Sequence, residues 1–391
     1  MRATQLPRGA LLPSADWRSR GVSSQRLAGP SLTTVFRGFS TPTAAPATLN
    51  TMCHVLQNDV LPGAVISHTT AAALLGIAVP WWVDRELGVL AAAAYRSDGV
   101  RIIPSTLPHP PQKNGDTSSD GLSDAWRARV ESGLPLDRHG IRSGPPAASR
   151  PLVEPPLMHC RLEPGPPRSV GPHATVHRTS SRASFSFHGL DLSHPYVVLL
   201  ELATMLDHDD IVIAVDSLIS RKPPLNGASL EKIRSSVDSF DRLWGVTALR
   251  RALEDARPNT DSPGETRTRL LLTRAGFPEP VINLPVRDPD AATTRYLDLA
   301  YPELKIAVEY DGDYHRVSRE QWLLDTARRD SLRSMGWNLR VLTGLDIKRP
   351  RRALDALHRS FVEAGARAPS PSNWTGRGER RLRRSLRPPT A

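Results

Sequence analysis

The sequence predicts a mixed α/β protein with a C-terminal core of helices and strands in the order αβββαβα. Within residues 258–362, short apolar runs with strand-like alternation lie between amphipathic helical segments. Residues 173–257 carry apolar side chains at helical spacing, which predicts a mainly helical upstream region. Residues 104–172 are rich in Pro, Gly and Ser, so we expect them to form a long disordered insertion.

Composition limits the classes of partner and of site. The chain has 391 residues, enough for two or three domains, and a formal charge of +11. Nucleic acid is the commonest partner of a basic protein, although a GC-rich genome also produces an Arg-rich chain. The two cysteines, Cys53 and Cys160, are too few for a disulfide framework or a cysteine zinc cluster. We therefore expect a cytoplasmic location.

The N-terminal region, residues 1–103, is expected to be partly disordered. Its first 50 residues are rich in Arg and Ser with Asp16 as the single acid, a composition similar to that of a transit peptide. Residues 32–42 predict a short pair of strands, and within residues 67–80 we expect one short helix that ends at Gly76. The longest apolar run, residues 71–83, is too short to span a membrane, so no membrane association is expected.

Ordered elements are predicted on both sides of residue 257. Upstream, we expect a helical turn over 124–134, a strand over 173–180 and packing helices over 192–206, 209–220, 229–240 and 245–256. In the C-terminal core we expect a helix over 262–276, strands over 281–287, 294–300 and 304–311, a helix over 319–336, a strand over 337–343 and a helix over 351–361. Residues 363–391 are expected to form a disordered basic tail.

Acidic residues gather on the strand predicted over 304–311. Side chains alternate between the two faces of a strand, so Lys305, Glu309 and Asp311 share one face. A tight hairpin to the preceding strand would place Asp298 beside Glu309. Carboxylate oxygens in this arrangement suit Mg²⁺, which can polarise a phosphodiester and lower the pKa of a bound water.

Three stretches of the C-terminal core carry a resemblance to a known family. In order and spacing, "SPGETRTRLLLTRAGFPEP", "YLDLAYPELKIAVEYDGDYH" and "DTARRDSLRSMGWNLRVLT" resemble the Vsr-like domain of unknown function of actinobacteria, a branch of the PD-(D/E)xK endonuclease superfamily. Upstream, "VFRGFSTP", "SHTTAAALLGIAVP" and "LDLSHPYVVLLELATMLDHDDIVIAVDSLISR" resemble the companion region of these proteins, which is related to AbiEi-type antitoxins. The resemblance implies a restriction-endonuclease-like sheet flanked by helices.

The resemblance also implies an acid on the first helix of the core and two acids on the central hairpin, which bind Mg²⁺ or Mn²⁺. Position 311, where such domains have a lysine, is Asp311 in this chain. Lys305 and His315 are then the residues expected to orient or deprotonate the attacking water. The candidate catalytic residues are Asp298, Glu309, Lys305 and His315, and the candidate metal ligands are Glu265, Asp298, Glu309 and Asp311.

These residues also have purely structural interpretations. Glu265 stands three positions after a serine, the pattern of a capping box. Asp311 is followed by glycine, and this dipeptide favours a turn. Asp298 lies in an apolar strand and needs a partner there, which is either a metal or an arginine such as Arg328 or Arg329.

Arginines are the candidate contacts to nucleic acid. Two of them lie on the predicted helix 319–336, where they contact phosphate or form ion pairs along the helix. The basic tail either grips phosphates electrostatically or is an unselected basic end. The candidates are Arg328, Arg329, Arg380, Arg381, Arg383 and Arg384.

Three hypotheses about function remain open from the sequence. The first is a Mg²⁺-dependent DNA endonuclease, and the second is a catalytically inactive DNA-binding regulator, which Asp311 in place of lysine favours. The third is an AbiEi-like component of a toxin–antitoxin or defence system with a protein partner, because a fold alone does not determine a function. No motif indicates a small-molecule cofactor.

Overall fold

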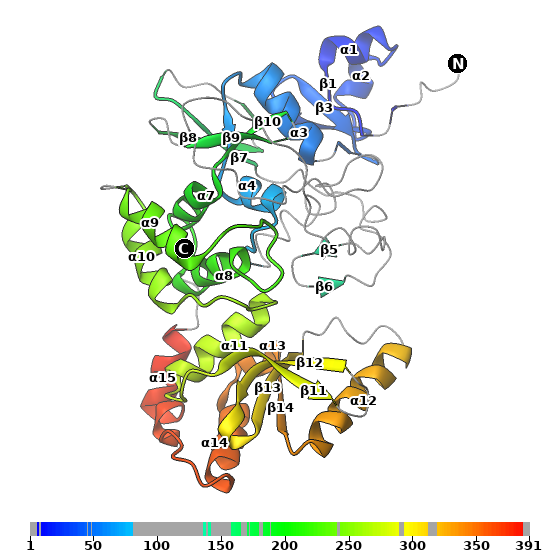
Figure 1. Ribbon diagram of the computed structural model, residues 1–391. Coiled ribbons are helices and arrows are strands. Elements are labelled where there is room, and N and C mark those ends of the chain that lie inside the picture. The colour runs from blue at the N-terminus through cyan, green and yellow to red at the C-terminus, as the bar shows by residue number, and fades with distance from the viewer. Residues whose placement is uncertain are drawn as a thin grey trace.

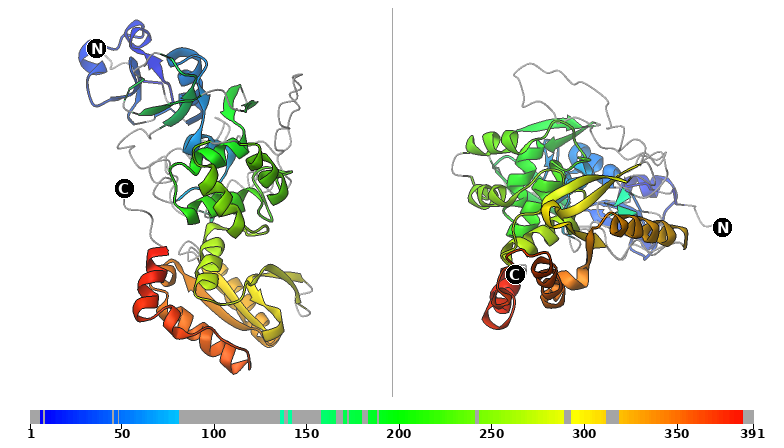
Figure 2. Two further views of the ribbon diagram at one scale, coloured as in Figure 1. Left: turned by 90° about the vertical axis from the view of Figure 1, so that its left-hand side faces the viewer. Right: turned by 60° about the horizontal axis from the view of Figure 1, so that its bottom comes forward.

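The computed structural model describes residues 6–80, 136–137, 140–141, 158–311 and 319–385, apart from short gaps at 8, 45, 48, 166–169, 172, 180–182, 188, 241–242 and 289–292. It is a mixed α/β structure, as the sequence predicts (Figure 1). An N-terminal part, a central part and a C-terminal part follow one another along the long direction of the molecule (Figures 1 and 2). The helical turn expected over 124–134 lies outside the described residues.

The N-terminal part is a small three-stranded sheet with two short helices. Its elements are β1 (Leu12–Pro13), α1 (Ser14–Ser19), α2 (Ser24–Leu27), β2 (Leu32–Phe36) and β3 (Phe39–Pro42). The expected strand pair is confirmed, since β2 and β3 pair antiparallel. Trp17 is fully buried, and its indole N–H donates a hydrogen bond to the Ser40 carbonyl at 3.0 Å. These residues fold around buried apolar side chains such as Phe36, and the partial disorder expected for residues 1–103 stays a prediction.

The central part is built on a five-stranded sheet. Its strands are β4 (Val65–Ile66), β7 (Met158–Leu162), β8 (Ala174–Arg178), β9 (Ser184–Phe187) and β10 (Leu190–Ser193), in the order β8-β7-β4-β10-β9. β8 confirms the strand expected over 173–180. The region 173–257 is mainly helical as expected, with α7 to α10 after three short strands. The expected disordered insertion 104–172 is wrong at β7, where Met158 and Cys160 are fully buried. A separate strand pair consists of β5 (Leu136–Asp137) and β6 (Gly140–Ile141).

Helices accompany this central sheet, and four of them correspond to the predicted packing helices. The first group is α3 (Leu49–Val55), η1 (Leu56–Val60) and α4 (His68–Leu75), and α4 ends at Gly76 as expected. The second group is α7 (Pro195–Leu202), α8 (His208–Leu218), α9 (Leu230–Asp238) and α10 (Val246–Asp255). No helix within the described part of the chain has both the length and the apolar character that crossing a membrane requires.

The C-terminal part is a four-stranded sheet covered on both faces. Its elements are α11 (Pro263–Arg274), β11 (Val281–Asp288), β12 (Thr293–Tyr301), η3 (Pro302–Leu304), β13 (Ile306–Asp311), α12 (Arg319–Ser334), β14 (Asn338–Thr343), α13 (Gly344–Lys348) and α14 (Arg351–Glu363). The strand order is β11-β12-β13-β14, with β13 and β14 parallel. Val308 packs with side chains of α11 and α14, whereas Ala307 packs with Leu332 of α12. The predicted order αβββαβα is confirmed, with α13 as an additional short helix.

The expected disordered tail instead folds back as η4 (Pro371–Asn373) and α15 (Gly376–Ser385). Trp374 is fully buried, its ring is stacked on Phe277 at 5.7 Å between centroids, and its indole N–H donates to Asp355 Oδ1 at 2.7 Å. Leu382 is buried in the same apolar cluster. These two apolar side chains hold a strongly basic segment against the core. The basic composition of the segment gives no indication of this docking.

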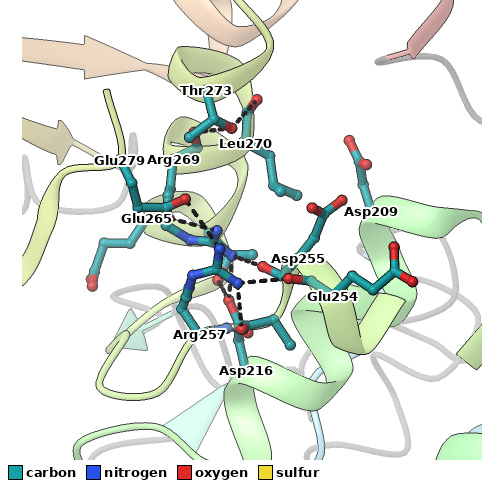
Figure 3. Close-up of polar contacts among 12 residues, drawn as sticks. Asp209, Asp216, Glu254, Asp255, Arg257, Glu265, Arg269, Leu270, Thr273 and Glu279 are labelled. Carbon is teal, nitrogen blue, oxygen red and sulfur yellow. Dashed lines mark hydrogen bonds and ion pairs between the residues drawn. The ribbon is translucent and has the colours of Figure 1, made fainter. Parts of the chain in front are cut away.

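A seam of ion pairs joins α11 to α8 (Figure 3). Arg269 Nη2 lies 3.2 Å from Asp216 Oδ2 and donates to the Asp255 carbonyl at 2.7 Å, while Arg269 Nη1 lies 3.1 Å from Glu279 Oε1. Both side chains of the Arg269–Asp216 pair are 1% exposed. Burial raises the pKa of Asp216 to about 6, although Arg269 opposes the shift. The other ion pairs of the seam are Arg267–Asp210 and Arg274–Asp209.

Arg269→Met should lower the free energy of unfolding by about 3–5 kcal/mol, because it removes one partner of a buried ion pair. Urea denaturation followed by circular dichroism measures this loss. Arg333→Met is the matched control, since Arg333 and its partner Asp330 are 62% and 65% exposed. That change should cost at most about 0.5 kcal/mol. Equal costs for the two variants would contradict the role given to the seam.

Trp374→Ala should also destabilise the chain, by about 3–5 kcal/mol, because it leaves a cavity between Phe277 and the segment that follows α14. Trp244 is 86% exposed, so Trp244→Ala serves as the control and should change stability by less than about 0.5 kcal/mol. The same urea titration compares them. A cost for Trp374→Ala within the range of the control would mean that the tail does not dock in solution.

Candidate functional site

The N-terminus of α11 is held by a cap and by a close approach to β13. Ser262 Oγ accepts a hydrogen bond from the Glu265 N–H at 3.2 Å, and Pro263 stands in the first turn. A Cβ on Gly264 would lie 2.0 Å from Tyr310 Cε1. The absence of a side chain at position 264 therefore lets α11 rest on Tyr310, and this brings Glu265 to the sheet.

The Glu265 carboxylate is buried and receives two hydrogen bonds. Its Oε2 accepts from the Asp261 N–H at 2.8 Å and from Asn283 Nδ2 at 3.0 Å. The capping interpretation therefore applies in a modified form, because the side chain accepts from Asp261, one residue before the N-cap Ser262. Asn283 adopts a φ of 48°, which is uncommon for a residue with a side chain and fits a local break in β11. Capping and contact with the sheet thus coexist at Glu265.

Asp298 lies on β12, the strand between β11 and β13. Ile282 pairs with Leu299, and Leu299 pairs with Val308, so the next position along the ladder sets Asp298 between Asn283 and Glu309. Asp298 Oδ2 accepts a hydrogen bond from the Tyr310 N–H at 2.9 Å. Its carboxylate is therefore held against β13 by a backbone donor, and it needs no arginine as a direct partner.

Glu309 is 5% exposed and forms an ion pair with Arg328 of α12. Arg328 Nη1 donates to Glu309 Oε2 at 2.8 Å, and Arg328 Nη2 lies 2.5 Å from Oε1. Oε1 is buried, and among the described residues no donor is aligned on it as a hydrogen bond requires, so Arg328 Nη2 meets it as an ion pair. Arg328 Nη2 also donates to the Tyr296 carbonyl at 2.8 Å, which orients the guanidinium.

Crowding of negative charge changes the acidity of this group. Burial, followed by the charge of Asp298, raises the pKa of Glu265. Burial, followed by the charge of Glu309, raises the pKa of Asp298, while the Tyr310 N–H and Arg328 lower it. A divalent cation would relieve this repulsion, because it favours the ionised form of every carboxylate around it.

Further charges surround the three acids. Asp311, at the end of β13, pairs with Arg329 at 3.1 Å, and both side chains are about one-third exposed or less. Asp261 pairs with Arg221, whose guanidinium lies over the Tyr296 ring at 4.1 Å from its centroid. Arg328 and Arg329, predicted as nucleic-acid contacts, are thus engaged with carboxylates in this structure.

The predicted position of Lys305 is wrong. The turn before β13 is the 3₁₀ helix η3, and Lys305 follows it with a left-handed φ of 52°, so it lies outside the strand. Its ammonium lies over the Trp337 ring, 4.9 Å from the centroid. Lys305 precedes Glu309 by four positions, which corresponds to about 13 Å along a strand. Lys305 is therefore not placed to assist chemistry at the acids.

The remaining predicted residues are His315 and the arginines of α15. His315 lies outside the described residues. Arg380 is exposed on α15, in the folded segment that replaces the expected disordered tail. The backbone of α15 also includes Arg381, Arg383 and Arg384, whose side chains lie outside the description.

The donor set suits a hard cation, which prefers carboxylate oxygens. Glu309 Oε1 already faces Arg328 Nη2, so a cation at this oxygen would compete with the guanidinium. The three acids would not all bind one Mg²⁺ directly, because the ion would reach part of the set only through a bridging water. Mg²⁺ usually retains several waters and takes only one or two carboxylates, so Asp298 and Glu309 are sufficient as direct ligands.

Sequence reasoning missed four residues that build this site: Asp261, Gly264, Asn283 and Arg221. Asn283 left a weak signal, because a polar amide interrupts an otherwise apolar run. Gly264 is the second residue of a helix, where a glycine lowers helix propensity and so invites a packing explanation. Arg221 and Asp261 had no local signal, since their pairing spans 40 positions of the chain.

Comparison with known proteins identifies relatives without an assigned activity. No family model matches the chain, and no solved structure matches it. The chain is similar to the uncharacterized proteins MT2308 and Rv2248 of two Mycobacterium tuberculosis strains, with 27% identity over 105 residues to each. The match covers 27% of this chain and 38% of each relative, so the chain spans well under half the length of these curated relatives.

Gly264→Ala should destabilise the chain by at least about 1–3 kcal/mol, because the new Cβ overlaps the rigid Tyr310 ring and must displace α11. Gly344→Ala is the control, since its Cβ would meet only Tyr310 Oη, at 3.5 Å, an ordinary contact. Urea denaturation of both variants tests the prediction.

A double change, Gly264→Ala with Tyr310→Ala, should lower the free energy of unfolding by less than the sum of the two single changes. Full additivity of the three losses would contradict the contact between Gly264 and Tyr310.

Proposed function

We propose that residues 258–362 form a PD-(D/E)xK-type endonuclease unit that hydrolyses phosphodiester bonds of DNA with Mg²⁺ or Mn²⁺. One observation carries the proposal: Glu265, Asp298 and Glu309 come from three separate elements, α11, β12 and β13, and repel one another in a largely buried position. Carboxylates are rarely crowded in this way unless a cation or a function compensates the cost. The motifs that resemble Vsr-like domains support the same assignment.

Asp298 and Glu309 are the direct metal ligands in this proposal, and Glu265 supports them from α11. A bound cation would polarise the scissile phosphodiester and lower the pKa of a water molecule. The chain contributes the positioning: the Tyr310 N–H holds Asp298, and the Asp261 N–H and Asn283 hold Glu265. These hydrogen bonds restrict the carboxylates before any ligand arrives, which reduces the cost of binding.

Arg328 has two roles in the proposal. It neutralises Glu309 through a two-point ion pair, and a cation bound at Glu309 competes with it for the same charge. The guanidinium would then be released, and its planar fork matches the oxygens of a phosphate. Arg328 thereby becomes a phosphate contact when the metal site is filled.

A basic surface close to the acids supports DNA as the substrate. β13 and β14 are parallel and pair Asp311 with Thr343, so α13 begins at the end of the sheet that carries the acids. Exposed basic residues follow along α13 and the start of α14, and such a run neutralises phosphates in a salt-dependent manner. They are Lys348, Arg349, Arg351 and Arg352.

A second candidate is a DNA-binding regulator without catalytic activity, as in an AbiEi-like system with a protein partner. The positions of Lys305 and Asp311 favour it. Lys305 lies over Trp337, and Asp311, at the usual lysine position, pairs with Arg329. In this alternative the ion pairs of Arg328 and Arg329 simply balance buried charge.

Cleavage of supercoiled plasmid distinguishes the two. The purified full chain should nick plasmid with Mg²⁺ or Mn²⁺, and EDTA should abolish nicking. Asp298→Ala should slow nicking by more than about 100-fold, because losing an outer partner of a metal already costs about 10–100-fold. Agarose gel electrophoresis over time gives the rates.

Asp330→Ala is the control for this assay, because Asp330 is an exposed acid of α12 that lies in an ion pair with Arg333. It should retain the full nicking rate. No cleavage by the unaltered chain, together with salt-sensitive DNA binding that survives Asp298→Ala, would reject the nuclease and support the regulator.

A further inference from the structure

Three histidines converge in the central part, far along the chain from the acids. His68 begins α4, His159 lies on β7 and His177 lies on β8. One ring nitrogen of each lies within 4.8 Å of the corresponding nitrogen of the other two. His68 and His159 are buried and His177 is half-buried. A set of three imidazoles from three elements is uncommon in a core, where histidine more often occurs alone with one partner.

The rings are close enough to share one ligand. His159 Nδ1 and His177 Nε2 are 2.9 Å apart, and the rings of His68 and His177 are stacked with centroids 3.7 Å apart. Two nitrogens bound to one tetrahedral zinc at about 2.0–2.1 Å lie about 3.3 Å apart. The separation between His159 and His177 therefore needs to grow by only a few tenths of an ångström.

The surroundings of His68 resemble an outer shell of a metal site. Its Nδ1 lies 2.9 Å from Ser67 Oγ and 4.0 Å from Glu201 Oε2, so ligation through Nε2 would leave Nδ1 oriented by oxygen partners. Glu201 Oε2 accepts from the His68 N–H at 2.9 Å, and Glu201 Oε1 accepts from Ser193 Oγ at 2.9 Å. The φ of 52° at His68 is unusual for a residue with a side chain, and Glu201 helps to hold it.

We propose that His68, His159 and His177 bind one transition-metal ion, with Zn²⁺ as the preferred ion. Imidazole nitrogens select zinc and its neighbours over Mg²⁺, so this site is chemically distinct from the acidic one.

Three protein ligands leave the fourth tetrahedral position for water or a small anion. The half-buried His177 marks the side on which such a ligand would enter. The ion would also join α4 to β7 and to the edge strand β8, because each element supplies one ligand. A metal site here does not depend on the proposed nuclease, since no residue is shared between the two.

Metal titration of the untagged full chain tests the proposal. After treatment with a chelator and its removal, the chain should bind one Zn²⁺, and Co²⁺ in its place should give the visible absorption of a tetrahedral nitrogen-ligated ion. His159→Gln and His177→Gln should each reduce the stoichiometry from one to none. His173→Gln should retain one ion, because His173 lies in the turn before β8 and is not one of the three. Asp298→Ala should also retain it.

Circular dichroism of each variant shows whether it folds. If His159→Gln does not fold, His177→Gln carries the test, because the side chain of His177 is only half-buried. The proposal is overturned if the unaltered chain gives no Co²⁺ absorption, or if His177→Gln binds the ion as the unaltered chain does. The three rings would then be a stacked, hydrogen-bonded cluster without a metal.

Discussion

The ion-pair seam between α8 and α11 is the constraint on which the rest of the structure depends. Arg269 is buried with Asp216, and its guanidinium also meets Glu279 and the Asp255 carbonyl (Figure 3). A buried charge is tolerated only when its partners are in place, so α11 has one position on the upstream helices. The same helix carries Glu265 in its first turn. The position of the acidic site is therefore linked to the central part through α11.

At the acidic site, the local electrostatics remain unfavourable even with the arginines present. Asp298 and Glu265 both have raised pKa values because burial and neighbouring carboxylates act in the same direction. Arg328 compensates the charge of Glu309 from α12. A cation bound among these acids would favour their ionised forms. This is the physical basis of the proposed nuclease.

The two proposed sites differ in the chemistry of their ligands and in the groups that orient those ligands. The acids are oriented by backbone N–H groups and by Asn283, which suits a hard cation that keeps its water. Of the histidines, His68 at the start of α4 is oriented by Ser67 and Glu201, and imidazole nitrogens suit a transition-metal ion. In the two proposals together, the acids bind a hard cation and the histidines bind a transition-metal ion.

The sequence by itself determined the elements of the C-terminal part and its helix caps, because periodicity, Ser262 and the glycines act over a few residues. It also singled out Asp298 and Glu309, since strand alternation is a local rule. Only the tertiary structure decided the surroundings of these residues. It places Arg328 against Glu309, and it places the Lys305 ammonium over Trp337 after the 3₁₀ helix η3. It also folds the tail onto the core. These depend on contacts between residues distant in the chain, and such contacts leave no periodic pattern. The three histidines meet for the same reason, through strand pairing that no single segment encodes.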